Sequence, residues 1–287
     1  WCCCLRWCCC RCLPLGAVVV AGAGADVSAC AGAGVSVGAG VSSGAGAGAG
    51  AGGDTGAVAG AAVAGVGGIL SKSSGFEIDK ILFVIGNDIL HTDNTRATTT
   101  SGTPQDVSGI WYENFKIARK LYTEIISGLL MIAPVHVVHN PSNHDYVTGT
   151  MLADAVYCWF NNCNDVTFDV TIAHRKYFKY GENLIGTSHG DGAKLADIPL
   201  LMANEAKDMW ANTTWRYVYL HHLHHKQKNI FQSGKDYQGV TVEHLRSPSG
   251  TDSWHHRNGY QHSPKAIEGF IHHKEYGQVA RITHLFK

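Results

Sequence analysis

The sequence lacks an excess of charge of either sign, because its 23 basic residues equal its 23 acidic ones. It also lacks a basic stripe with interleaved aromatic residues, which is typical of a nucleic-acid groove. Charge therefore gives no argument for a polyanionic partner, but nucleic acid stays open, since bound metal ions add positive charge that the count omits. The 287 residues, 45% of them hydrophobic, suffice for one large domain or two small ones.

Histidine and cysteine are each missing from a different part of the chain. All 17 histidines follow residue 90, whereas seven of the ten cysteines lie within residues 1–12 and an eighth is Cys30. The early cysteines form no spaced C-x2-C pairs, which weakens a zinc module, and adjacent cysteines are poorly placed for disulfides. Palmitoylation and metal scavenging are alternatives, but the composition favours an unstructured tail.

Charged and bulky side chains are scarce in residues 16–70, where only Asp26 and Asp54 carry charge. Such a segment buries too little apolar area to offset its chain entropy, so we expect a disordered tail over 1–75 and a folded domain over 76–287. Its apolar runs are shorter than the roughly 20 residues of a spanning helix, and no clean secretory signal is present. We therefore expect a cytoplasmic protein that does not use a membrane. A misplaced start or reading frame is an alternative origin for the tail.

From Ser74 onward the composition is that of an α/β domain. A continuous apolar run over 80–85 ends at a glycine, as in a strand buried on both faces. Apolar residues at helical spacing predict a helix over 110–131, after a polar loop over 92–109. The other predicted elements are strands at 134–138, 166–171, 183–187 and 216–220, helices at 151–160 and 197–210, and an antiparallel layer from 239–244, 266–272 and 278–284. The simplest architecture is a four-layer α/β/β/α sandwich of two mixed sheets flanked by helices.

Short polar clusters follow the predicted strands in a fixed order. They are Gly86-Asn87-Asp88, Asn143-His144-Asp145, His189-Gly190-Asp191 and His222-Leu223-His224. Carboxylate, amide and imidazole groups are what proteins use to hold divalent ions, and open α/β sheets bind ligands at the carboxyl ends of their strands. Each cluster alone is explained as well by a turn or a solvated strand end. Their common order predicts a metal site.

These clusters resemble the sequence blocks of the calcineurin-like metallophosphoesterase family, and within it the predicted phosphoesterases of phages and bacteria. The resemblance covers about residues 76–287. It matches Gly86-Asn87-Asp88 to the G-D-x block, 142–145 to G-N-H-D/E, His189 to the lone histidine, and 221–224 to G-H-x-H. The first block of that family, D-x-H, is missing, because residues 1–75 contain no histidine.

The resemblance implies a dinuclear centre of divalent ions, either manganese or alternatively iron, zinc or nickel. The implied metal ligands are Asp88, Asn143, His189, His222 and His224. Asp88 would bridge both ions, because a carboxylate has two oxygens. Asn143, His189 and His222 would complete the coordination of one ion, and His224 would bind the other.

Two further residues have implied catalytic roles. His144 would stabilise charge or protonate the leaving oxygen, and Asp145 would hold the orientation of His144. In the loop after Asp88, His91 or Asp93 is a candidate replacement for a ligand of the missing block.

The implied activity is hydrolysis of a phosphodiester or phosphomonoester by metal-activated water, as in a phosphatase or a DNA-processing nuclease. The implied partner is a phosphate-ester substrate, and the sequence does not indicate the oligomeric state. Two other hypotheses stay open. One is a truncated or catalytically inactive protein with this fold. The other is a histidine-rich protein for metal storage or sensing, whose metal binding would not depend on Asp88 or Asn143.

Overall fold

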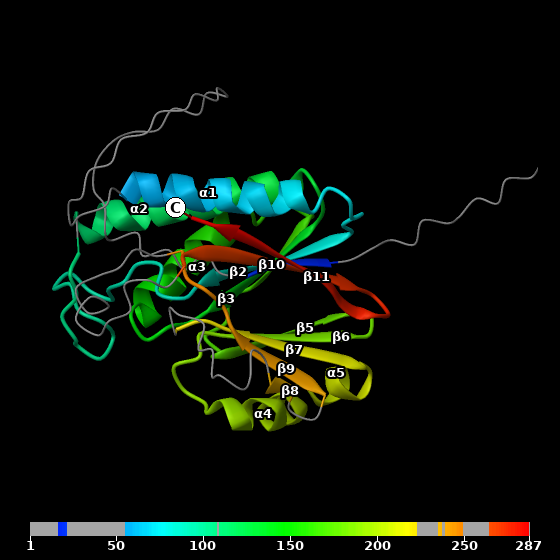
Figure 1. Ribbon diagram of the computed structural model, residues 1–287. Coiled ribbons are helices and arrows are strands. Elements are labelled where there is room, and N and C mark those ends of the chain that lie inside the picture. Colours follow the sequence, from blue (N-terminus) through cyan, green and yellow to red (C-terminus); the bar gives the residue numbers. More distant parts are fainter. Residues whose placement is uncertain are drawn as a thin grey trace, which may run out of the picture.

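The computed structural model describes residues 17–21, 55–107, 109–222, 235–236, 239–248 and 264–286. These residues form two β-sheets that pack face to face, with helices against their outer faces (Figure 1). Both sheets combine parallel and antiparallel pairs. The predicted α/β class and the sandwich of two mixed sheets are confirmed.

The first sheet has six strands in the order β11-β10-β1-β2-β3-β4. Their bounds are β1 (Ala17–Ala21), β2 (Lys80–Gly86), β3 (Val135–Asn140), β4 (Val166–Asp169), β10 (Ala266–His273) and β11 (Gly277–Leu285). The strands from β1 to β4 run parallel, while β10 and β11 add an antiparallel edge. Nearly every residue of β2 and β3 is buried, because both faces of this part of the sheet are covered.

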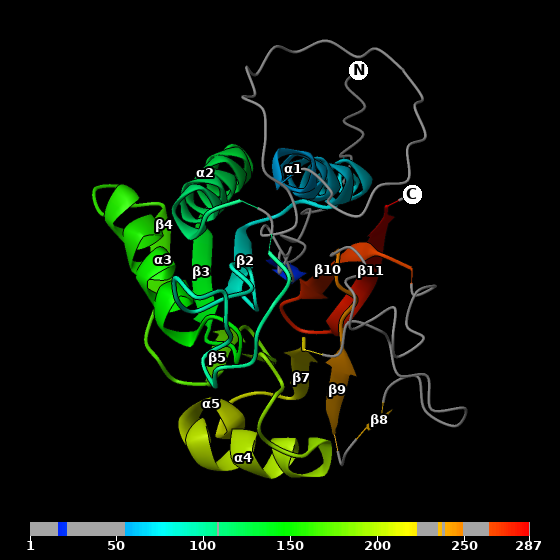
Figure 2. The ribbon, with the colours of Figure 1, turned by 90° about the vertical axis from the view of Figure 1, so that its left-hand side faces the viewer.

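Three helices cover the outer face of the first sheet: α1 (Thr55–Lys72), α2 (Trp111–Leu130) and α3 (Tyr146–Trp159). Figure 2 shows α1 and α2 side by side above the strands. Their apolar residues form one core with the sheet, to which Ile69, Phe83, Leu121 and Val156 contribute. The polar face of α2 stays exposed, as its helical spacing of apolar residues predicts.

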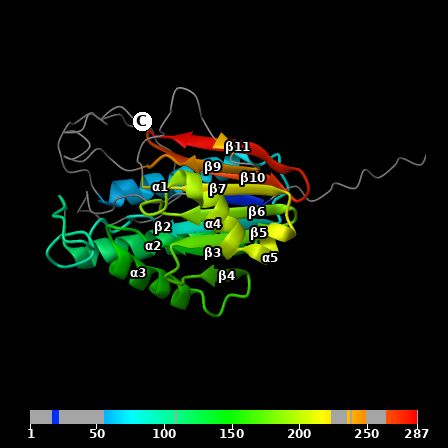
Figure 3. The ribbon, with the colours of Figure 1, turned by 90° about the horizontal axis from the view of Figure 1, so that it is seen from below.

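The second sheet has five strands in the order β5-β6-β7-β9-β8. Their bounds are β5 (Arg175–Tyr180), β6 (Asn183–Ser188), β7 (Trp215–Leu220), β8 (Lys235–Asp236) and β9 (Val240–His244). A short 3-10 turn (Leu195–Asp197) leads into α4 (Ile198–Glu205) and α5 (Lys207–Ala211), which cover its outer face. In Figure 3, where the molecule is seen from below, the strands of this sheet lie over those of the first.

The inner faces of the two sheets meet in an apolar layer. Leu82 and Phe270 of the first sheet contact Ile185 and Tyr219 of the second. The rings of Tyr219 and Phe270 stack with their centroids 4.2 Å apart. This layer fixes the two sheets against each other, so the ends of their strands keep a defined relative position.

Two segments within residues 1–75, where the composition favours disorder, form regular elements of the structure. β1 lies between β10 and β2, parallel to β2, with Ala17 opposite Lys80. α1 packs on the sheet through Ile69, and its glycines allow close approach: a Cβ added at Gly65 would lie 2.7 Å from the ring of Phe286. The folded part of the chain therefore begins before residue 76.

Several element boundaries also differ from the sequence prediction. The predicted helix over 197–210 is interrupted at Ala206, whose φ of −115° and ψ of 44° separate α4 from α5. α3 begins at Tyr146, ahead of the expected residue 151, and β5 was not predicted. Of the expected antiparallel layer, the pairing of β10 with β11 is confirmed, but β9 pairs parallel to β7 in the other sheet. Within the described ranges, no helix combines the length and apolarity needed to cross a bilayer.

Candidate metal site at the carboxyl ends of four strands

Four strands, two from each sheet, carry the polar clusters at one edge of the sandwich. Gly86 ends β2 opposite Asn140 of β3, and Ser188 ends β6 opposite Leu220 of β7. Across the sheets, the hydroxyl of Thr187 donates to Oδ1 of Asn140 at 3.0 Å. Since parallel strands end at the same edge, the residues that follow each of these strands are brought together.

The imidazole of His189 lies at the centre of this site. Its Nε2 is 3.2 Å from Asp88 Oδ2, 2.9 Å from Asn143 Oδ1 and 3.2 Å from His222 Nδ1. One ring nitrogen carries at most one proton, so it can donate to only one of these three neighbours. The ligand atoms of Asp88, His189 and His222 all lie within 4.8 Å of one another. The lone pairs of these three side chains could hold a metal ion.

The charges within the group are set by burial and by mutual contact. Burial raises the pKa of Asp88, but the charge and the hydrogen bond of His189 outweigh it and hold that pKa well below its usual range. Burial lowers the pKa of His189, and the carboxylate of Asp88 more than offsets this, so the pKa is raised. Burial and the charge of His189 lower the pKa of His222, which favours the neutral imidazole that binds metals.

The turn after β2 is built from left-handed backbone. Gly86, Asn87 and Asp88 have φ angles of 94°, 59° and 67°. Non-glycine residues seldom adopt such angles, and where they do the surrounding structure must hold them. Here the main-chain N–H of Asp88 donates to the hydroxyl of Ser142 at 2.9 Å. A side chain at Gly86 would collide with the carbonyl oxygen of Asn140. This turn aims the Asp88 carboxylate at His189.

His144 lies against Asp88 from the start of α3. Its main-chain N–H donates to Asp88 Oδ1 at 3.2 Å. Its ring contacts His91, with the two Nδ1 atoms 3.3 Å apart and the ring centroids 5.1 Å apart. His91, which follows Asp88 by three residues, also has a left-handed φ of 62°. The rings of His91 and His144 therefore contact each other beside the turn that carries Asp88.

The carboxyl group of Asp145 is fully buried and faces away from solvent. The hydroxyl of Ser142 donates to its Oδ1, and the main-chain N–H of Leu90 donates to its Oδ2 at 2.8 Å. Burial and the charge of Asp88 raise the pKa of Asp145 to about 7. These contacts tie Asp145 to the loop between β2 and α2, whereas the ring of His144 contacts His91.

The structure brings together most of the residues singled out from the sequence. Asp88, Asn143, His189 and His222 converge, whereas His224 lies outside the described residues. Asp93, a candidate replacement ligand, binds the first turn of α3: its Oδ1 accepts from the N–H groups of 147 and 148 at 2.9 and 2.8 Å. This contact satisfies helix N–H groups and leaves Asp93 with a structural role.

Sequence reasoning missed the importance of three polar residues around the site. Ser142 connects Asp88 to Asp145, and Asn87 Oδ1 lies 3.4 Å from His189 Nδ1. His221, the residue that precedes His222 in the chain, is buried. This burial and the charge of His189 lower its pKa to about 3. Their signal in the sequence is weak, because Ser142 and His221 occupy positions where the resemblance implies glycine.

No protein-family model matches the chain, and no curated protein matches it. The assignment of a function therefore depends on the geometry of the site and on the order of its sequence blocks.

Proposed function

We propose that this protein is a metal-dependent phosphoesterase that hydrolyses a phosphodiester or phosphomonoester with metal-activated water. The observation that carries the proposal is the convergence of Asp88, Asn143 and His222 on Nε2 of His189. These residues follow four strands from two sheets, in the order that the metallophosphoesterase resemblance implies.

The donor atoms fit a divalent transition metal. Two oxygens, from Asp88 and Asn143, and two imidazole nitrogens, from His189 and His222, suit manganese, iron, zinc or nickel. When bound, such an ion supplies hydroxide near neutral pH and offsets the charge of the phosphoryl oxygens. We propose a second ion as well, for which Asp88 and His224 would be ligands.

His144 is proposed as the proton donor. As hydroxide attacks phosphorus, the bond from phosphorus to the leaving oxygen breaks, and the ring of His144 gives its proton to that oxygen. Its main-chain N–H meanwhile holds Asp88 Oδ1, so one residue positions both the carboxylate and the proton. His91, in contact with the His144 ring, orients it.

Asp145 is proposed as a positioning residue. Its carboxyl group holds the hydroxyl of Ser142, which in turn accepts from the N–H of Asp88. It also holds the N–H of Leu90, next to His91. Through Ser142 and Leu90, Asp145 thereby holds the turn that carries the metal-binding carboxylate.

The test is hydrolysis of bis(p-nitrophenyl) phosphate by the full chain with added Mn²⁺, beside calorimetric titration of Mn²⁺. We expect Asp88→Asn to reduce turnover by about 100-fold or more and to weaken Mn²⁺ binding. The matched control is Asp154→Asn, which removes an exposed carboxylate of α3 that is not among the grouped ligand atoms. It should retain turnover.

Three results would reject the proposal. Turnover that survives in Asp88→Asn would place the chemistry elsewhere. Mn²⁺ binding without turnover in the folded wild type would favour an inactive protein with this site. Metal binding that is unchanged by both Asp88→Asn and Asn143→Ala would favour a histidine-rich binding protein.

A further inference from the structure

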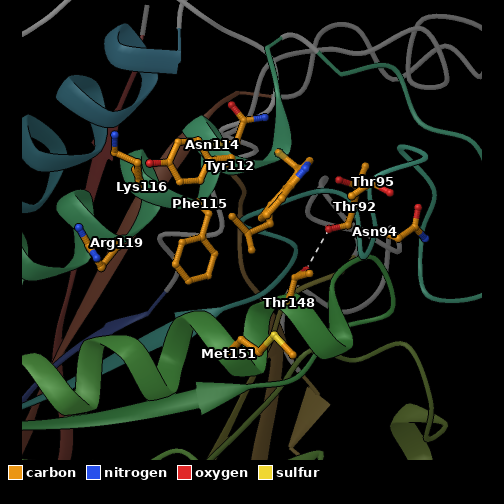
Figure 4. A pocket seen from close by; sticks show the side chains of 12 residues that line it. Thr92, Asn94, Thr95, Tyr112, Asn114, Phe115, Lys116, Arg119, Thr148 and Met151 are labelled. Carbon is orange, nitrogen blue, oxygen red and sulfur yellow. Dashed lines mark hydrogen bonds between the residues drawn. The ribbon is translucent and has the colours of Figure 1, made fainter.

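A pocket of about 540 Å³ opens between the first turns of α2 and α3 and the loop after β2 (Figure 4). Phe115 of α2 and Met151 of α3 face it from two sides, and Thr92 and Asn94 of the loop line a third. Pockets for small molecules occupy about 300–1,000 Å³ and are mostly apolar, so this one has the size and lining of a ligand site.

The loop after β2 lines this pocket and also carries Asp88 of the proposed metal site. Leu90 and Thr92 line the pocket and flank His91, whose ring contacts His144. The N–H of Leu90 donates to Asp145, and the carbonyl oxygen of Thr92 accepts from the hydroxyl of Thr148. The same short loop therefore positions the metal-binding carboxylate and forms one side of the pocket.

Large aromatic side chains remain exposed at this pocket. Trp111 and Tyr112 are 54% and 51% exposed, although they begin a helix whose other face is buried. Their rings meet edge to face with centroids 6.1 Å apart. Met151, across the pocket, is 60% exposed. Apolar side chains gathered on a surface in this way mark a binding site.

Positive charge lies along the α2 side of the pocket. Lys116 and Arg119 line it, and Nζ of Lys116 lies 5.0 Å from the centroid of the Tyr112 ring. Neither an aromatic wall nor a cation specifies a ligand alone. Together with a phosphoesterase centre beside them, they fit a flat, aromatic group that is joined to phosphate.

We propose that this pocket binds the base of a nucleotide, whose phosphate ester reaches the group formed by Asp88, His189 and His222. The inference rests on the proposed phosphoesterase function and names its substrate class. The base stacks on the aromatic side chains, as bases do in proteins that bind single strands. An acyl chain would also fill an apolar pocket, but it would gain nothing from flat stacking surfaces or from the cations.

The test is saturation-transfer NMR of the full chain with AMP, with ribose 5-phosphate as the ligand that lacks the base. Both titrations are done in EDTA, so that binding is read without metal or hydrolysis. We expect AMP to bind at least about tenfold more tightly than ribose 5-phosphate, with the strongest transfer to its adenine protons. Trp111→Ala should weaken AMP binding about tenfold and leave ribose 5-phosphate unchanged.

The control variant is Tyr276→Ala, which removes another exposed aromatic side chain that does not line the pocket. It should bind AMP as the wild type does. Because Trp111 is half exposed, its replacement should leave the fold intact, and a melting curve checks this. A single-stranded oligoadenylate in place of AMP separates the two sources of a nucleotide, and Trp111-dependent binding of either supports the proposal.

Equal binding of AMP and ribose 5-phosphate would overturn the inference, as would AMP binding that Trp111→Ala does not change. Displacement of AMP by octanoate, with octanoate the tighter ligand, would assign the pocket to acyl chains. Trp111-dependent AMP binding in a protein without Mn²⁺-dependent turnover would keep the nucleotide pocket and reject the phosphoesterase function.

Discussion

Asp88 and Asp145 share one hydrogen-bonding partner, the hydroxyl of Ser142, which accepts from the N–H of Asp88 at 2.9 Å and donates to Oδ1 of Asp145. Two buried carboxyl groups are thereby held near each other. Their repulsion is divided unevenly, because His189 pairs with Asp88 and keeps it ionised, whereas burial and the charge of Asp88 raise the pKa of Asp145 to about 7. Ser142 is the link on which this arrangement depends.

We therefore expect Ser142→Ala to destabilise the protein by about 1–3 kcal/mol, because it leaves a buried N–H and a buried carboxyl oxygen unpaired. Affinity for Mn²⁺ should fall about tenfold, since the turn that carries Asp88 loses its support. Urea unfolding and calorimetry measure the two effects. Ser127→Ala, which removes an exposed hydroxyl bonded within α2, is the control. Equal stability of the two variants would show that Ser142 does not hold the turn.

A second prediction concerns pH and His272 of β10. This side chain is buried, its Nε2 lies 3.0 Å from the hydroxyl of Tyr219, and burial lowers its pKa to about 3. The unfolded chain therefore binds a proton that the folded chain does not, between the ordinary histidine pKa and about 3. Above that ordinary pKa, His272 therefore does not lower the free energy of unfolding. Below it, the free energy of unfolding falls as the pH falls.

Between pH 7 and pH 5.5 this residue should remove about 1 kcal/mol of stability. Urea unfolding at both values, for the wild type and His272→Gln, isolates the contribution, because other buried histidines titrate in both proteins. The wild type should lose about 1 kcal/mol more than the variant over this interval. Identical losses would mean that His272 can be protonated in the folded state.

The strand ends that hold the site could be predicted from the sequence. Asp88 follows the apolar run of β2, which forms a buried strand with few alternatives, and His189 follows β6, a buried strand that ends in Gly186, Thr187 and Ser188. What the runs could not reveal is which lone pairs would face each other, since Asn143 and His222 reach His189 only through the packing of two sheets. Distances between residues on separate sheets depend on that packing.

The pocket could not be predicted for a similar reason. Helical spacing placed Trp111 and Phe115 on one amphipathic helix, but Met151 joins them only because α2 and α3 are neighbours. Sequence periodicity describes the faces of one element. It does not identify which side chains of another element will complete a cavity.

A third prediction concerns the charges that join the two sheets. Arg281 of β11 binds Glu268 of β10 at 2.6 Å and Glu243 of β9 at 2.5 Å. Glu268 is only 2% exposed. Arg281→Met should destabilise the protein by about 3–5 kcal/mol, because it leaves a buried carboxylate without its partner.

Arg281→Lys keeps the charge but loses the fork of N–H groups that reaches both carboxylates, so we expect an intermediate loss in urea unfolding. Lys120→Met, which breaks an exposed ion pair with Glu124 within α2, is the control and should change stability by less than about 1 kcal/mol. If Arg281→Met lowered the free energy of unfolding no more than this control does, the ion pairs of Arg281 would contribute little to stability.

The last prediction tests whether the glycine- and alanine-rich segment of α1 belongs to the fold. Its small residues offer little apolar area each, so the sequence favoured disorder. The helix nevertheless approaches β10 closely at a glycine of that strand: a Cβ added at Gly269 of β10 would lie 2.6 Å from Ile69 Cγ2 of α1. Gly269→Ala should therefore destabilise the protein by about 1–3 kcal/mol through overpacking.

Ile69→Ala should make room for the new methyl group, so the double variant should lose less stability than the sum of the two single losses. Gly67→Ala is the control in the same helix, because a Cβ at Gly67 meets nothing within 4 Å. It should leave stability unchanged or raise it by up to about 1 kcal/mol, since alanine favours the helix. Additive losses for Gly269 and Ile69 would separate α1 from β10 and return this segment to the disordered tail that its composition predicts.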